Sequence, residues 1–381
     1  MTTLAHTDMQ SMQRALAHAR AATGLASPNP TVGCVLVRDG RIVGEGAHQY
    51  DARDHAEIVA LQQAGLSAAG ATAYVTLEPC SHTGRTGPCA DALITARIAR
   101  AVVATLDPNP AVCGRGIARL RSAGIAVEVG LCEAEARSLN DGFARFIQTQ
   151  MPFVTLKVAL SSDGYSAPPP GTHTERKTYW LTGAAARNHV QQMRHASGAL
   201  LTGIGTILAD DPALTDRSGL PRRRRLLRAV LDSQLALPPD SQIIDNGDVL
   251  LFCSPTAYPE RASELARRGV QIVRIPVLGD GRLDLNIALA HLASRQILNV
   301  LVEAGPRLNG SLLRAALVDK AVLFHAPLAL GPGSLPFADG VALAKFEQSL
   351  QHQRRTPIGE DVCVSGYVHD PWPHRTLTTD N

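Results

Sequence analysis

The chain is poor in aromatic residues and has no strong excess of charge of either sign. Phe, Trp and Tyr together make up 4% of its 381 residues, and the formal net charge at pH 7 is +3. A protein that stacks many bases needs aromatic platforms, and one that holds nucleic acid by its phosphates needs a basic surface. The composition therefore argues against a nucleic-acid-binding protein. The basic run at residues 222–225 is interpreted as a solvated loop in preference to a phosphate-binding patch.

Long hydrophobic runs and a disulfide framework are also missing. No apolar stretch reaches the roughly 18 residues that a transmembrane helix needs, and residues 1–10 lack the basic-then-apolar order of a signal peptide. The seven cysteines are odd in number and scattered, so no disulfide pairing is indicated. Apolar residues at 45% and charged residues at 19% are typical of a soluble globular chain. We expect a cytoplasmic protein of two domains that does not enter a membrane.

One group of residues carries the signature of metal chemistry. His55-Ala56-Glu57 is followed by Pro79-Cys80 and by Cys89. One imidazole and two thiolates supply three zinc ligands, and three protein ligands leave a fourth position for water, which distinguishes a catalytic zinc from a structural one. Water held there ionises near neutral pH, and Glu57 can carry the proton without touching the metal. Zinc-dependent nucleobase deaminases have this arrangement, so we predict Glu57 as catalytic and His55, Cys80 and Cys89 as metal ligands.

The spacing of the two thiols adds detail and leaves alternatives. Eight residues separate Cys80 from Cys89, where the generic deaminase pattern has two. The intervening loop is polar and contains Gly and Pro, so the chain can turn back and present both sulfurs. Ordinary buried residues are one alternative, and a structural zinc with His82 as the fourth ligand is another. We expect His55 and Cys89 at helix starts, where the helix dipole favours thiolate over thiol.

Strand-like and helix-like patterns alternate along the chain, which predicts an α/β protein. The expected domains are residues 1–147 and 148–370, followed by a polar tail at 371–381 that, with residues 369–370, should be loosely ordered. An Asp39-Gly40 pair predicts a hairpin turn. The first half should contain helices at 9–22, 55–64, 114–123 and 133–148 and strands at 31–37, 41–46, 71–77, 98–105 and 125–129. The second half should contain strands at 156–160, 199–202, 228–231, 249–253, 270–275 and 299–303 and helices at 183–197, 260–268, 285–294 and 306–317.

Two glycine segments of the second half each join an expected strand to an expected helix. They are Gly203-Ile204-Gly205-Thr206 and Glu303-Ala304-Gly305-Pro306. Such a loop can present backbone N–H groups and a helix dipole to a phosphate. Neither segment is a Gly-x-Gly-x-x-Gly fingerprint, so a Rossmann domain is not supported. Plain turns and a dinucleotide phosphate site both remain open interpretations.

Several motifs, in order along the chain, resemble those of the bifunctional riboflavin-biosynthesis deaminase/reductase family. The resemblance covers roughly residues 9–370, and the segment between Asp163 and Trp180, which holds three prolines, is longer than the family's compact loop. The matching motifs are Ser27-Pro28-Asn29-Pro30-Thr31-Val32-Gly33-Cys34, His55-Ala56-Glu57, Thr76-Leu77-Glu78-Pro79-Cys80-Ser81-His82, Asp107-Pro108-Asn109-Pro110, Leu156-Lys157, Ser162-Asp163-Gly164, Leu208-Ala209-Asp210-Asp211-Pro212-Ala213-Leu214-Thr215, Val230-Leu231-Asp232-Ser233 and Val302-Glu303-Ala304-Gly305-Pro306.

The resemblance implies a fold and two site inventories. The N-terminal half would be a cytidine-deaminase-like α/β/α sandwich and the C-terminal half a dihydrofolate-reductase-like α/β domain that uses NADPH. The deaminase pocket would contain Asn29, His48, His82, Arg85, Asp107 and Asn109. The reductase cofactor would be bound by Lys157, Ala159, Asp163, Trp180, Thr206, Asp210, Ser233 and Gly305. The reductase substrate would be bound by Thr178, Arg194, Leu214, Arg217 and Glu303.

The resemblance also implies two successive reactions on a small pyrimidine carrying a ribosylamino phosphate. Zinc-dependent deamination comes first, and reduction of the ribosylamino group to ribitylamino by NADPH follows; a homo-oligomer is implied too. An alternative is a deaminase whose reductase-like domain has lost reduction. An editing deaminase acting on nucleic acid is disfavoured by the weak charge and the few aromatics. A zinc-stabilised binding module without activity is the least favoured hypothesis.

Overall fold

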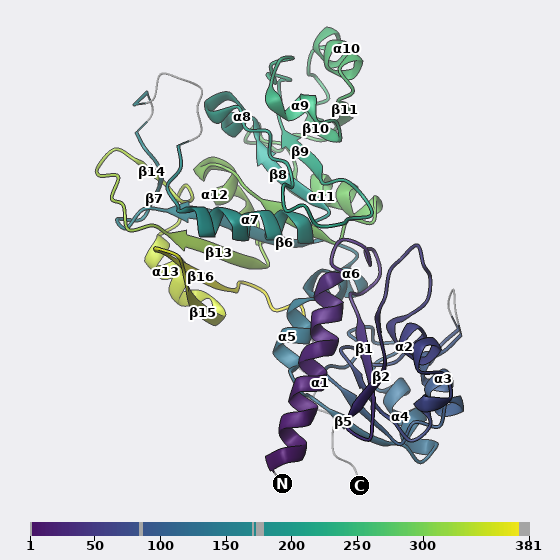
Figure 1. Ribbon diagram of the computed structural model, residues 1–381. Coiled ribbons are helices and arrows are strands. Elements are labelled where there is room, and N and C mark those ends of the chain that lie inside the picture. The colour runs from purple at the N-terminus through teal and green to yellow at the C-terminus, as the bar shows by residue number, and fades with distance from the viewer. Residues whose placement is uncertain (1, 84–86, 170, 173–178, 373–381) are drawn as a thin grey trace. The chain divides into compact units, whose positions relative to one another are not determined.

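The computed structural model describes residues 2–83, 87–169, 171–172 and 179–372. These residues form two compact units (Figure 1). The first contains residues 2–150 with 221–223 and 371–372, and the second contains residues 151–220 and 224–370. Every helix in the described part of the chain is too short or too polar to cross a lipid bilayer. The units are described separately below.

The first unit is built on a five-stranded sheet in the order β2-β1-β3-β4-β5. Strand β1 pairs antiparallel with β2 and β3, whereas β3, β4 and β5 run parallel. The predicted hairpin turn lies between β1 and β2, where Asp39 and Gly40 both have positive φ, 49° and 72°. The strands are β1 (Gly33–Arg38), β2 (Arg41–Ala47), β3 (Thr72–Val75), β4 (Arg100–Val103) and β5 (Ala126–Val129).

Helices cover both faces of this sheet (Figure 1). Ala60 of α2, Leu93 of α3 and Leu120 of α4 belong to one buried cluster, and Met12 and Leu16 of α1 belong to another. Strand β1 contributes side chains to both clusters, because successive side chains of a strand point to opposite faces of the sheet. This confirms the predicted α/β/α sandwich. The helices are α1 (Thr2–Ala21), α2 (Ala56–Ala64), α3 (Cys89–Thr95), α4 (Arg115–Ser122), α5 (Glu133–Ser138) and α6 (Asp141–Thr149).

The second unit is built on a nine-stranded sheet in the order β11-β10-β9-β8-β12-β6-β13-β16-β15. The strands from β11 to β13 are parallel, and β16 and β15 add an antiparallel edge. Seven parallel strands place seven carboxyl ends on one side of the sheet, where α/β proteins bind ligands. The strands are β6 (Phe153–Leu160), β8 (Ala199–Gly203), β9 (Leu227–Leu231), β10 (Val249–Cys253), β11 (Gln271–Arg274), β12 (Asn299–Val302), β13 (Lys320–His325), β15 (Gln351–Ile358) and β16 (Asp361–Tyr367).

The core of the second unit lies between its sheet and the helices that connect the parallel strands. Phe252 of β10, Leu289 of α11 and Leu312 of α12 are buried in one cluster. A short β7–β14 pair lies apart from the main sheet. The remaining elements are β7 (Tyr165–Ala167), β14 (Leu335–Pro336), α7 (Ala184–Ala196), α8 (Ile204–Asp210), α9 (Gln242–Asp245), α10 (Pro259–Arg267), α11 (Leu285–Ser294), α12 (Pro306–Arg314) and α13 (Leu343–Ser349).

Two expectations about the elements are wrong. The single helix predicted over 133–148 is two helices, α5 and α6. They are separated near Asn140, whose side chain bonds the backbone of Thr31. Its Oδ1 accepts from the Thr31 N–H at 2.7 Å, and its Nδ2 donates to the Thr31 carbonyl at 3.0 Å. No element was predicted beyond residue 317, so strands β13 to β16 and helix α13 were missed. The side chains of β15 are polar and almost all exposed, so they show no alternation.

The expectation of a loosely ordered tail is also wrong for residues 369–372. The His369 backbone N–H donates to the Asp319 carbonyl at 3.0 Å. Within the first unit, the buried Trp372 side chain donates its indole N–H to Asp141 Oδ1 at 3.0 Å. An aromatic side chain with a satisfied polar tip anchors a terminus well. The rest of the predicted tail, residues 373–381, lies outside the described residues.

Candidate active sites

The three predicted metal ligands converge in the first unit. His55 is the residue that caps the start of α2, and Cys89 is the first residue of α3. His55 Nδ1 lies 3.2 Å from Cys89 Sγ and 3.6 Å from Cys80 Sγ. Donor atoms that share one tetrahedral zinc lie roughly 3.3–3.8 Å apart. The local placement follows the prediction, and the three side chains fit a zinc ion.

No fourth protein ligand joins this cluster in the described part of the chain. The grouped donors are those of His55, Cys80 and Cys89, all within 4.8 Å of one another. His82 has an exposed side chain and is not a member of the group. The alternative of a closed four-ligand site through His82 therefore finds no support among the described residues. A three-ligand zinc site keeps one position for chemistry.

The electrostatics of the cluster suit both metal binding and proton transfer. Hydrogen bonding with the Cys89 side chain, aided by His55, lowers the pKa of Cys80 well below its usual value. The Cys89 backbone N–H also donates to the Cys80 sulfur at 3.3 Å. Glu57 lies in the first turn of α2 and is 3% exposed, and this burial raises its pKa to about 7. A carboxyl group with a pKa near the working pH is a good general acid and base.

Replacing a thiolate ligand should remove the metal. We expect Cys89→Ser to lower bound zinc from about one ion per chain to about a tenth or less, because a hydroxyl is a much poorer zinc ligand than a thiolate. Deamination should fall with the metal content. Cys132→Ser, at a half-buried cysteine outside the cluster, is the matched control. Elemental analysis of the purified proteins measures the outcome, and a fully zinc-loaded Cys89→Ser protein would contradict the assignment.

Two of the predicted pocket residues, Asn29 and His48, are hydrogen-bonded to each other near the metal ligand His55. Asn29 Nδ2 lies 3.0 Å from His48 Nε2, and His48 Nδ1 lies 2.8 Å from the Asp54 carbonyl oxygen. The histidine nitrogen beside a carbonyl must donate, so Nε2 accepts from the Asn29 amide. The rings of His48 and His55 meet edge-on, with centroids 5.3 Å apart. His48 thus holds Asn29 and the residue before His55 in one arrangement.

The other predicted pocket residues follow strands β3 and β4. Asp107 is buried, and burial raises its pKa to about 6. Its Oδ1 accepts the Asn109 backbone N–H at 2.8 Å, which forms a tight polar turn. Arg85, also predicted as a pocket residue, lies outside the described residues.

The second unit contains a cavity of about 1800 Å³ at the carboxyl ends of its parallel strands. Its size exceeds the range of ~300–1,000 Å³ that is usual for pockets holding one drug-sized ligand. Both predicted glycine segments lie at this edge, since α8 follows β8 and α12 follows β12 directly. The predicted residues that line the cavity are Lys157, Ala159, Trp180, Arg194, Thr206, Asp210, Leu214, Arg217, Ser233, Glu303 and Gly305.

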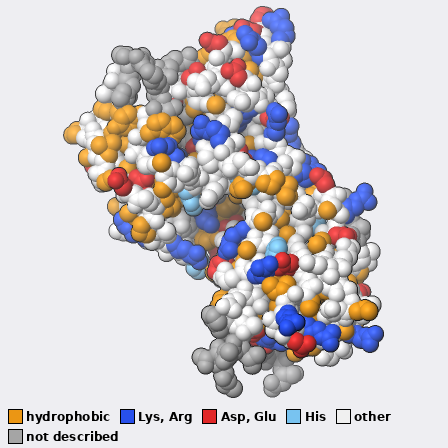
Figure 2. All heavy atoms as spheres, in the orientation of Figure 1, with side chains coloured by type: hydrophobic (Ala, Val, Ile, Leu, Met, Phe, Trp, Pro, Cys, Tyr) orange, Lys and Arg blue, Asp and Glu red, His pale blue; other side chains and the backbone are white. Residues whose placement is uncertain are grey.

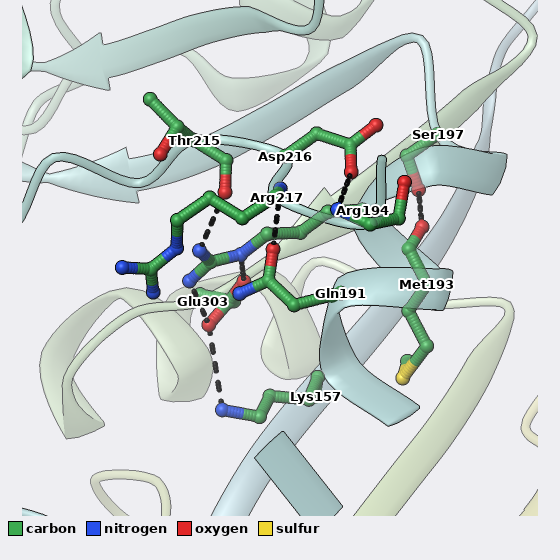
Figure 3. A network of polar contacts seen from close by, with 10 residues as sticks. Lys157, Gln191, Met193, Arg194, Ser197, Thr215, Asp216, Arg217 and Glu303 are labelled. Carbon is green, nitrogen blue, oxygen red and sulfur yellow. Dashed lines mark hydrogen bonds and ion pairs between the residues drawn. The ribbon is translucent and has the colours of Figure 1, made fainter. Parts of the chain in front are cut away.

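A buried ion network forms part of the cavity wall (Figure 3). Arg194 donates to both Glu303 oxygens, through Nε at 2.7 Å and Nη2 at 3.1 Å, and Lys157 Nζ lies 3.3 Å from Glu303 Oε2. Burial would raise the pKa of Glu303, but the Lys157 and Arg194 cations outweigh it and lower this pKa to about 2. Glu303 is therefore a firmly ionised carboxylate.

The network distinguishes Arg194 from Arg217, which were both predicted to bind the reductase substrate. Nη1 of Arg194 donates to the Thr215 carbonyl at 2.9 Å, so its guanidinium is held on three sides within the wall. The Arg217 side chain is exposed, and Figure 3 draws no contact between its guanidinium and Glu303. Arg217 is thus better placed to meet a phosphate, while Arg194 orients Glu303. The assignment of these residues to the substrate stays a prediction.

Two other cavity predictions have different outcomes, and one residue of the lining was not predicted. Asp163 is not among the residues that line the cavity, because its carboxylate accepts the Leu330 and Gly331 backbone N–H groups at 3.1 and 2.7 Å. Thr178 lies outside the described residues. Arg187 was missed, although it lines the cavity with its guanidinium 5.1 Å from the Trp180 ring centroid. No sequence motif marks Arg187, since only folding brings α7 beside this tryptophan.

The basic run at residues 222–225 lies in a loop, as expected. Arg225 pairs with Asp248 at 3.8 Å, and Arg224 donates to the Arg295 carbonyl at 3.3 Å. On the face shown in Figure 2, Lys and Arg side chains are interspersed with Asp and Glu. A broad basic surface of the kind that tracks phosphates is not visible on that face.

Two family models match the chain one after the other. Residues 5–105 match the cytidine and deoxycytidylate deaminase zinc-binding region, and residues 152–364 match the RibD C-terminal domain. The first match agrees with the three-ligand cluster on an α/β/α sandwich, and the second covers the sheet that carries the large cavity. The class is therefore a zinc-dependent deaminase domain joined to a reductase domain that uses NADPH. The chain belongs to the RibD family.

Relatives match over nearly the whole chain. The riboflavin biosynthesis protein RibD of Escherichia coli (strain K12) is 42% identical over 368 residues, 93% of this chain and 97% of its own. RibD of Aquifex aeolicus is 39% identical, covering 94% and 97%.

Solved structures agree with this. Acinetobacter baumannii RibD has a TM-score of 0.78 at 39% identity and covers 95% of this chain and 99% of its own. A Thermotoga maritima protein described as a diaminohydroxyphosphoribosylaminopyrimidine deaminase/5-amino-6-(5-phosphoribosylamino)uracil reductase has a TM-score of 0.78 at 32% identity, with the same coverage.

Proposed function

We infer that this chain is the bifunctional deaminase and reductase of riboflavin biosynthesis, acting first through its N-terminal and then through its C-terminal unit. The observation that carries this is the three-ligand cluster beside the buried Glu57, in one chain with a cavity large enough for a dinucleotide and a substrate. We propose 2,5-diamino-6-(ribosylamino)-4(3H)-pyrimidinone 5′-phosphate as the substrate. Relatives that cover nearly the whole chain support this.

In the deaminase unit, His55, Cys80 and Cys89 would hold zinc, which supplies the activation of water when bound. Glu57 accepts a proton from the attacking water and delivers it to the ring nitrogen. It then carries the remaining hydroxyl proton to the amino group, so that ammonia leaves and the ring carbon becomes a carbonyl. Its pKa of about 7 lets it act in both directions near neutral pH. The pyrimidine and its ribosyl phosphate are bound by Asn29, His48, His82, Arg85, Asp107 and Asn109.

In the reductase unit, the cavity would hold NADPH and the deaminated pyrimidine together. NADPH supplies hydride to the open imine form of the ribosylamino group, and the protein orients the two molecules. The helix starts after β8 and β12 offer backbone N–H groups to the cofactor phosphates. Glu303 is held by Lys157 and Arg194 and places a negative charge in the cavity wall. Eleven of the predicted reductase residues line the cavity, and no observation favours the alternative of lost reduction.

The order of the two reactions can be tested with the purified, zinc-loaded protein. We expect ammonia release from the diaminopyrimidine without NADPH, and NADPH oxidation only once deaminated product has formed. Pre-deaminated pyrimidine supplied directly should support NADPH oxidation without ammonia release. Absence of ammonia would disprove the deaminase assignment, and ammonia without NADPH turnover would establish the alternative of lost reduction.

We also propose a reducing, cytoplasmic location and a homo-oligomeric state. The location is supported by the need for Cys80 and Cys89 as free thiols, which a reducing compartment preserves. The oligomer is supported by the resemblance alone, and light scattering of the purified protein would test it.

A further inference from the structure

Glu78 makes an unusual set of contacts next to the metal ligands. It is 3% exposed, and its carboxylate accepts four backbone N–H groups. Oε2 accepts from Asp107 at 3.1 Å and Gly114 at 2.9 Å, while Oε1 accepts from Gly116 at 2.9 Å and Ile117 at 3.4 Å. The two oxygens of an ionised carboxylate offer about four acceptor positions, so Glu78 uses its full capacity on one loop and the start of α4.

Gly116 shows independently that this loop is built against the metal-binding segment. A Cβ atom at Gly116 would lie 1.9 Å from the Pro79 carbonyl oxygen and 3.2 Å from Glu78 Oε1. The first turn of α4 therefore packs against the peptide that joins Glu78 to Cys80. Glycine alone permits this close approach.

The loop that Glu78 holds carries two of the predicted substrate ligands. Asp107 is bonded to Glu78 directly through its backbone, and its side chain in turn accepts the Asn109 N–H at 2.8 Å. Asn109 Oδ1 accepts the Ala111 N–H at 3.0 Å, which continues the turn. A chain of hydrogen bonds thus runs from the residue two before Cys80 to Asn109.

We propose that Glu78 is a positioning residue for deamination, which sets the substrate-binding loop 107–114 in register with the metal-binding segment. It acts through backbone groups and reaches neither the metal nor the substrate itself. The inference rests on the proposed function, because Asp107 and Asn109 must contact the pyrimidine. A catalytic carboxylate would change kcat, whereas this one should change how well the substrate is held.

Glu78→Gln tests the proposal with almost no change in shape. The glutamine amide keeps one acceptor oxygen, which can still accept two backbone N–H groups. Its NH2 group cannot accept, so the two hydrogen bonds made by the other carboxylate oxygen are lost. We expect KM for the pyrimidine to rise about tenfold or more and kcat to change by less than about threefold. Zinc content and NADPH oxidation on pre-deaminated substrate should equal those of the wild type. Glu128→Gln, at an exposed carboxylate on β5 of the same unit, is the matched control and should change neither constant.

Two results would overturn the proposal. A Glu78→Gln protein that loses zinc or fails to fold would show that Glu78 supports the whole unit, and an unchanged KM would show that the loop needs no such anchor. Amide hydrogen exchange adds a direct measurement, because the Asp107, Gly114 and Gly116 N–H groups should exchange faster in Glu78→Gln. Unaltered exchange at all three amides would also overturn it.

A double-mutant cycle separates positioning from general damage. If Glu78 acts through Asn109, then Glu78→Gln should raise KM much less in an Asn109→Ala background than in the wild type. Additive effects would overturn the proposal. Failure of the proposed function is distinguishable, because the wild-type protein would then release no ammonia, or Asn109→Ala alone would leave KM unchanged.

Discussion

Glu57→Gln should abolish ammonia release while the same chain continues to oxidise NADPH. Glutamine matches glutamate in shape but cannot accept the proton of water or return it to the leaving amine. Positioned general acids and bases contribute about 10²–10⁴-fold, and Glu57 must act in both capacities. We therefore expect deamination to fall about 10³-fold or more. Glu57 is buried in the first turn of α2, so no bulk water replaces it.

The other activity and the zinc content of the same protein serve as controls for this prediction. NADPH oxidation on pre-deaminated substrate reports an intact second unit, and zinc content reports an intact cluster. Glu128→Gln, at an exposed carboxylate, should release ammonia at the wild-type rate. A Glu57→Gln protein that keeps its zinc and releases ammonia within about tenfold of the wild type would refute the role of Glu57 as proton carrier.

Glu303→Ala should destabilise the second unit by about 3 kcal/mol and stop reduction. Truncation leaves the buried Arg194 and the partly buried Lys157 without their shared carboxylate, and an uncompensated buried cation is costly. Denaturant unfolding followed by amide hydrogen exchange in strands β6 and β12, which lie in this unit, measures the change. Deamination should persist, because the zinc cluster belongs to the other unit.

The half-exposed pair of Arg261 and Glu264 provides the comparison in the same unit. Glu264→Ala should cost less than about 1 kcal/mol, because solvent screens a surface ion pair. An equal loss of stability in the two variants would contradict the account of Glu303.

The same network predicts a stability change in acid. The folded-state pKa of Glu303 is about 2, below its ordinary value of 4.5. A lowered carboxyl pKa contributes stability that is present above pH 4.5 and is lost as the pH falls towards 2. Wild-type protein should therefore lose stability over that window more steeply than Glu303→Gln, whose amide does not titrate.

The sequence by itself determined the parts of this protein that depend on neighbouring residues. His55 and Glu57 lie at the start of one helix and Cys89 begins another, as their positions before apolar runs predict. The Asp39-Gly40 hairpin and the strand-to-helix glycine segments were also predicted. These features are local, because backbone conformation and helix starts are set within a few residues. The family motifs then fixed the class of chemistry.

Only the tertiary structure decided which distant groups meet. The order of the parallel strands brings Lys157, Arg194 and Glu303 together, although more than a hundred residues separate the first from the last. The tertiary structure of the first unit likewise divides the predicted helix at Asn140 and brings four backbone N–H donors to Glu78. Hydrophobic periodicity indicates which side of a helix or strand is buried. It does not indicate which polar side chain or N–H group from elsewhere in the chain will contact that element. That pairing follows from sheet order and helix packing, which are settled only when the whole chain folds.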